Sequence, residues 1–187
     1  METPQVFGLN EVVRIVGMSE PSIKFWTAGR RGSALRIRPS VHRATGKGSR
    51  NLYSREDVLL FAVARQMRGD GLPSEAIKEV IQLAQDDSGD RKGDFWGGII
   101  VLARVSETNE RTAKENPWPE GEWKAQLLPN RQAARACFDS VPGLSIPFFP
   151  PGPVLSFYAL DLKQLVASVD QAIDEICRVP SEAKENM

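Results

Sequence analysis

Basic side chains that could bind phosphate cluster early in the chain. Five of them lie in one short run, which alternates apolar and basic residues at 35–38 and continues as a glycine-rich basic loop: Arg36, Arg38, Arg43, Lys47 and Arg50. Gly46 and Gly48 flank one of these side chains and let the backbone approach a polyanion closely. Such a run binds the sugar-phosphate backbone of DNA with an affinity that falls as salt rises, but it reads little base sequence.

Charge is distributed unevenly, although the 187 residues have a formal net charge of zero. Up to Arg55 the sequence holds ten Lys or Arg against three Asp or Glu, a net charge of +7. From Asp86 onward it holds eleven basic and sixteen acidic residues, a net charge of −5. This asymmetry indicates that one end binds a polyanion and the other does not. A solvated basic face without a partner is the alternative.

Catalytic constellations are poorly supported. His42 is the single histidine and lies in the basic run, where contact with phosphate or solvent is expected, so histidine-dependent triads and histidine-rich metal sites are excluded. Cys137 and Cys177 have no neighbouring Cys or His. Asp174 and Glu175 are adjacent on an expected helix and point in different directions. We expect no enzyme activity, no cofactor and no metal.

Two short helical patterns joined by a tight turn, over residues 7–26, precede the basic run. Gly17 supplies a backbone that tolerates a left-handed turn. Ser19 is a natural N-cap for the second helix, and Pro21 is tolerated in its first turn. A short second helix with an exposed polar beginning is what the DNA major groove accepts.

The expected orientation of this second helix leaves one choice open. Ile23 can face the core together with Phe25 or Trp26, while Ser22 and Lys24 face outward. Trp26 is expected either in the core, as aromatic residues at helical spacing usually are, or on the DNA backbone.

A hairpin and two further helices are expected next. Residues 35–38 and 51–53 have strand patterns on either side of the glycine-rich loop, which together would form a wing. Ser54 caps a helix that runs to about Arg68, with Asp57 as the capping-box partner. Residues 69–71 break that helix, and apolar residues at helical spacing from Ala76 to Ala84 predict another.

This order of elements closely resembles the DNA-binding domain of MerR-family transcription regulators. The resemblance covers about residues 6–85 and rests on three motifs: Tyr53-Ser54-Arg55-Glu56-Asp57, Gly71-Leu72 followed by Ile77-Lys78, and Ser22-Ile23-Lys24-Phe25-Trp26. It implies a winged helix-turn-helix, a homodimer and binding to pseudo-palindromic promoter DNA. Double-stranded DNA, a second copy of the chain and RNA polymerase are the implied partners.

Two departures from the family pattern concern the wing and the region after residue 85. The wing is longer and more basic than usual, and Arg50 lies three residues before Tyr53, where the family's basic residue lies two before. Typical members continue directly into a long dimerisation helix, whereas residues 86–94 here read as a linker.

The fold class expected is α+β, with the MerR-like winged helix-turn-helix followed by a small α+β domain that ends in a long helix. The expected domains are residues 1–85 for DNA binding, a linker at 86–94, and residues 95–187 for dimerisation and effector binding. Strand patterns lie at 97–105, 123–128, 145–149 and 154–160, and a short helix is expected at 131–138.

The final helix is expected to begin after Asp161, with Gln164 completing its capping box. It carries a seam with heptad-like spacing: Leu162, Leu165, Val169, Ala172 and Ile176. A dimerisation helix and a helix that covers its own sheet both fit two heptads.

We expect a sequence-specific, double-stranded DNA-binding transcription regulator that acts as a homodimer on inverted repeats. The alternatives are an accessory DNA-binding protein of excisionase, terminase small-subunit or segregation type, and a protein-interaction adaptor. No membrane span or signal peptide is expected, so the cytoplasm and its nucleoid are the expected location. The candidate DNA contacts are Arg14, Ser22, Lys24, Trp26, Arg36, Arg38, His42, Arg43, Lys47 and Arg50.

Overall fold

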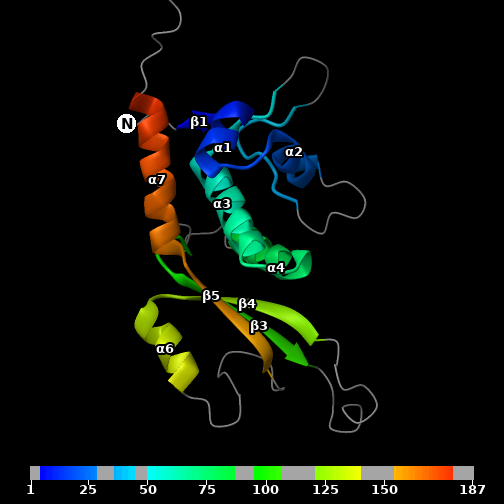
Figure 1. The fold of residues 1–187 in the computed structure, drawn as a ribbon, viewed down its shortest axis with the longest axis vertical. Helices are drawn as coiled ribbons and strands as arrows, with labels where there is room; N and C mark the ends of the chain where they lie inside the picture. The colour runs from blue at the N-terminus through cyan, green and yellow to red at the C-terminus, as the bar shows by residue number, and fades with distance from the viewer. Residues whose placement is uncertain are drawn as a thin grey trace, which may run out of the picture. The chain divides into compact units, whose positions relative to one another are not determined.

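The computed structural model describes residues 5–28, 36–44, 50–86, 95–106, 121–139 and 154–178. The chain forms two compact units (Figure 1). The head unit lies within residues 1–72 and 164–187, and the sheet unit within residues 73–163. The first segment of the head unit ends at residue 72 rather than at the expected domain boundary, residue 85. The expected domain boundaries stay a prediction. The mixed helix and strand composition confirms the expected α+β class.

The head unit is built on a helix-turn-helix. Its elements are β1 (Val6–Phe7), α1 (Leu9–Val16), α2 (Glu20–Ala28), β2 (Tyr53–Ser54), α3 (Arg55–Gly69) and the part of α7 (Leu162–Arg178) from Gln164 onward. The strands β1 and β2 pair antiparallel. Helix α3 is the central support, because most of its residues from Val58 to Ala64 are fully or nearly fully buried.

The turn between α1 and α2 forms as the sequence predicted. Gly17 has a φ of +66°, and its N–H donates to the Val13 carbonyl at 2.9 Å. The Nη1 atom of Arg65, on α3, donates to the Val16 carbonyl at 2.6 Å. This contact satisfies a carbonyl that the end of a helix leaves without an intrahelical donor, and so ties α1 to α3.

The start of α3 is held by a capping box, which confirms the predicted roles of Ser54 and Asp57. The Ser54 hydroxyl accepts from the Asp57 N–H at 3.2 Å, and Asp57 Oδ2 accepts from the Ser54 N–H at 2.9 Å. Asp57 is buried, and its Oδ2 atom also accepts from the N–H and the hydroxyl of Ser40, both at 2.8 Å. One carboxylate therefore joins the α3 start to the α2–α3 connection.

The α2–α3 connection, residues 36–44 and 50–52 among those described, differs from the expected hairpin. The described residues 36–39 form no strand, and Ile37 is fully buried with its N–H donating to the Trp26 carbonyl at 3.0 Å. His42 and Leu52 form an isolated antiparallel bridge with hydrogen bonds of 3.2 and 2.9 Å. Tyr53 pairs with Phe7 instead.

The sheet unit holds a three-stranded antiparallel sheet in the order β4–β3–β5. Its elements are α4 (Ser74–Asp86), β3 (Ile99–Ser106), β4 (Gly121–Leu128), α6 (Arg131–Asp139) and β5 (Val154–Asp161). One face of the sheet packs with α6, through a cluster made of Ile99, Val101, Ala103, Leu128 and Ala134. Helix α4 packs on β4 and β3. These strands and helices confirm the sequence prediction, except that the strand expected at 145–149 lies outside the described residues.

Helix α7 begins as predicted, because Asp161 Oδ1 accepts from the Lys163 N–H at 3.1 Å. Its later part runs alongside α1 and α3 (Figure 1). Arg55 Nε and Nη2 donate to the two carboxylate oxygens of Asp170 at 2.7 and 2.6 Å. Hydrogen bonding to Asp170 raises the pKa of Arg55 above its ordinary value.

The expected dimerisation seam on α7 needs a correction. Leu162 and Val169 are buried within the chain itself, and so is Ile173, which the seam did not include. Leu165, Ala172 and Ile176 are half-buried along one flank of the helix. Among the described residues, no helix is both long and apolar enough to cross a bilayer.

Candidate nucleic-acid interface

Trp26 belongs to the core of the head unit. Its side chain is only 3% exposed, and its ring is parallel to that of Phe61 with centroids 6.4 Å apart. Tyr53 packs edge-on against the same Phe61 ring at 5.7 Å. A ring held in this way is not accessible to a duplex, so the core alternative for Trp26 holds and the DNA-contact alternative is wrong.

Phe25 takes the outward position instead. It is 46% exposed, although it is one of the larger apolar side chains of the head unit. Pro21, Lys24 and Ala28 are also exposed, and together these four residues form what we call the outer face of α2. Phe25 was missing from the sequence-based candidates, although the spacing held the signal. Ile23 and Trp26 are three residues apart and share a helix face, whereas Phe25 falls about 200° from Ile23.

The polar groups predicted to face the groove already have partners on α2 or at the residue before it. Lys24 forms an exposed ion pair with Glu20 one turn earlier. Ser22 is half-buried, and its hydroxyl lies 2.8 Å from that of Ser19. Ser19 acts as the cap that the sequence predicted, because its Oγ atom accepts from the Ser22 N–H at 3.4 Å and its carbonyl accepts from the Ile23 N–H at 3.2 Å.

The α2–α3 connection carries three exposed arginines. Arg38, Arg43, Arg50 and His42 are exposed, whereas Arg36 is half-buried and Lys47 lies outside the described residues. The connection is held at two points. One is the contact between Ser40 and Asp57 described above. The other is the Asn51 Oδ1 atom, which accepts from the Ala44 N–H at 2.8 Å.

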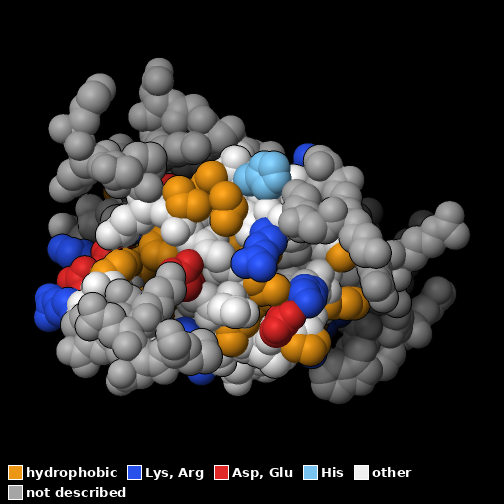
Figure 2. All heavy atoms as spheres, turned by 90° about the horizontal axis from the view of Figure 1, so that it is seen from above, with side chains coloured by type: hydrophobic (Ala, Val, Ile, Leu, Met, Phe, Trp, Pro, Cys, Tyr) orange, Lys and Arg blue, Asp and Glu red, His pale blue; other side chains and the backbone are white. Residues whose placement is uncertain are grey.

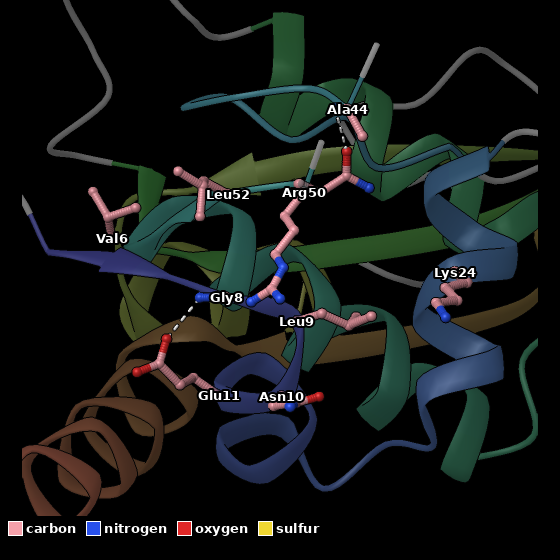
Figure 3. Close-up of a pocket in the computed structure, with 10 residues that line it drawn as sticks. Val6, Gly8, Leu9, Asn10, Glu11, Lys24, Ala44, Arg50 and Leu52 are labelled. Atoms are coloured by element: carbon pink, nitrogen blue, oxygen red, sulfur yellow. Dashed lines mark hydrogen bonds between the residues drawn. The ribbon is translucent and has the colours of Figure 1, made fainter. Parts of the chain in front are cut away.

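A cleft of about 810 Å³ separates this connection from α1 and α2 (Figure 3). Arg50 extends from the connection toward Gly8 and Leu9 at the beginning of α1, and Lys24 lines the cleft from α2. Glu11 also lines it, but its carboxylate accepts from the Gly8 N–H at 2.6 Å. Two cations, Arg50 and Lys24, therefore line the cleft from different sides. The Glu11 carboxylate in the cleft is hydrogen-bonded to the Gly8 N–H.

The charges on the face shown in Figure 2, which is seen from above relative to Figure 1, are mixed rather than uniformly basic. Figure 2 shows Lys and Arg side chains interspersed with acidic and apolar ones over the described part of that face. Arg14 is exposed on α1. Such a surface can bind DNA with cations and still present apolar groups to base edges.

The helix-turn-helix, its partner helices and its basic connection match a known family. A model of the family described as MerR HTH family regulatory protein matches residues 7–84. Residues 7–84 are therefore similar to the MerR helix-turn-helix family. The match confirms the range of about 6–85 inferred from sequence, and residues 85–187 lie outside it. A MerR-family helix-turn-helix indicates DNA binding and transcription regulation. No curated protein in the comparison matches the chain.

Proposed function

We propose that this MerR-family chain is a sequence-specific, double-stranded DNA-binding transcription regulator that acts as a homodimer on inverted-repeat promoter sites. The observation that carries the proposal is the outer face of α2, which is exposed beside a connection rich in arginine. A short helix presented in this way fits the major groove, while the neighbouring cations bind the flanking phosphates.

The two regions divide the work of recognition. The outer face of α2 contacts base edges and supplies sequence specificity. Arg38, Arg43 and Arg50 contact phosphates. Arg14 on α1 and Lys47, which lies outside the described residues, are further contacts. Removing one phosphate contact reduces the slope of log K against log salt concentration by about 0.9, whatever the sequence of the duplex.

Dimerisation is proposed through the flank of α7 that the chain leaves half-exposed. Leu165, Ala172 and Ile176 share this flank at spacings of seven and four residues, so they can meet the same residues of a second copy. Two heads related by a twofold axis would read two half-sites in inverted orientation. The proposed regulator acts in the cytoplasm, on nucleoid DNA, together with RNA polymerase.

Binding of the purified full-length chain to fragmented genomic DNA at about 0.15 M salt tests this function, because weak phosphate-only binding is suppressed there. We expect discrete sites in promoters, each an inverted repeat. Arg43→Ala should weaken all sites by a similar factor, and Glu175→Ala, an exposed residue on α7, serves as the matched control. Clusters of direct repeats near a recombination or packaging locus would support an accessory protein instead. Absence of enrichment would contradict the proposal.

A further inference from the structure

We propose that Phe25 is a specificity-determining residue that reads the C5-methyl group of a thymine in the major groove. The inference rests on the proposed DNA-binding function and assigns a base-reading role within it. The supporting observation is the difference in exposure between two adjacent aromatic residues of this short helix. Phe25 is 46% exposed, whereas Trp26 is 3% exposed.

The position of Phe25 on the helix is fixed by its neighbours. Ile23 and Trp26 are buried on the inward face, and Trp26 stacks on Phe61. The helix therefore cannot rotate to bury Phe25 without expelling Trp26 from the core. Pro21 precedes Phe25 by one turn and Ala28 follows it by three residues, and both are exposed. The outer face of α2 thus carries an apolar stripe.

Because the polar side chains of α2 already have partners, the apolar stripe is the part of the helix that remains available to contact base edges. Lys24 is paired with Glu20, and the Ser22 hydroxyl is engaged with Ser19. A phenyl ring cannot donate a hydrogen bond to a phosphate or to a base edge. The apolar feature that the major groove offers is the thymine methyl group, which distinguishes T·A from the other base pairs through apolar contact.

Removing the methyl group from the DNA tests this contact directly. A duplex selected from a random library with the full-length chain is resynthesised with deoxyuridine in place of each thymidine in turn. Binding is then measured by fluorescence anisotropy at about 0.15 M salt. We expect wild-type affinity to fall about fourfold at one or two positions of each half-site, the value for burying a methyl-sized group. Phe25→Ala should bind the thymidine and deoxyuridine duplexes equally at those positions.

Two further variants make the result specific. Phe25→Leu keeps an apolar side chain and should retain most of the discrimination, whereas stacking on the face of a base would need the aromatic ring. Val41→Ala alters a comparably exposed apolar residue in the α2–α3 connection and should keep the wild-type discrimination. Equal discrimination by wild type and Phe25→Ala, or no dependence of wild type on any methyl group, would overturn the role of Phe25. A selection in which wild type enriches no duplex sequence would overturn the proposed function itself.

Discussion

Replacing Trp26 by alanine should destabilise the protein without removing a DNA-contacting group. The ring is nearly fully buried and stacks on Phe61. Truncation of a buried large aromatic residue to alanine costs about 3–5 kcal/mol, because apolar contacts are lost and a cavity remains. Since a domain is stable by only about 5–15 kcal/mol, the substitution removes a large share of the total.

Urea unfolding of the full-length chain, followed by circular dichroism at constant protein concentration, measures this loss. Circular dichroism is needed because removal of a tryptophan alters the fluorescence signal itself. Phe25→Ala is the matched control on the adjacent position. It should change the free energy of unfolding far less than Trp26→Ala does, since 46% of its surface is exposed, and should weaken DNA binding instead.

The reasoning about the two faces of α2 would be refuted by the opposite pattern. If Trp26→Ala kept wild-type stability and lost DNA affinity while Phe25→Ala unfolded readily, the helix would present Trp26 outward. Trp26→Phe provides a further check, because it keeps an aromatic ring against Phe61 and should lose less stability than Trp26→Ala.

Four other substitutions separate charge, positioning and packing. Glu20→Gln should raise DNA affinity by about two- to fivefold at low salt, because it removes a negative charge and frees Lys24 from an exposed ion pair. Unchanged affinity in an anisotropy titration would count against this interface. Asp57→Ala should lower the free energy of unfolding by about 1–3 kcal/mol. Ser40→Ala should lower it by less, because only Asp57 also holds the start of α3. Equal losses for the two variants would contradict this difference in roles. Ile173→Ala should lower the free energy of unfolding by about 2–5 kcal/mol at any protein concentration, since Ile173 is buried within one chain. A loss of stability that disappears at high protein concentration would instead place Ile173 in a dimer interface.

Local signals in the sequence predicted most of the head unit. The left-handed turn needs a residue such as Gly17, and the capping box needs side chains such as Ser54 and Asp57 at a spacing of three. These requirements involve only neighbouring residues, so the sequence is sufficient to place α1, α2 and α3. The sheet strands and the start of α7 at Asp161 were predictable for the same reason.

Features that depend on contacts distant in sequence were predicted less well. Whether Phe25 or Trp26 faces inward depends on Phe61, which lies 35 residues beyond Trp26. The expected strand at 35–38 gave way to a segment in which Ile37 is buried, because core packing outweighs local alternation. Heptad spacing on α7 did not reveal that Asp170 pairs with Arg55, 115 positions away.

The most direct test of the central claim is the ratio of affinities for a selected duplex and a scrambled duplex of equal length and composition. It should be measured with the full-length wild-type chain and with Phe25→Ala at about 0.15 M salt. We predict that wild type binds the selected duplex at least about a thousandfold more tightly than the scrambled one. Phe25→Ala should reduce that ratio while leaving the affinity for the scrambled duplex unchanged. Equal affinity of wild type for the two duplexes would contradict the account, because α2 would then read no sequence.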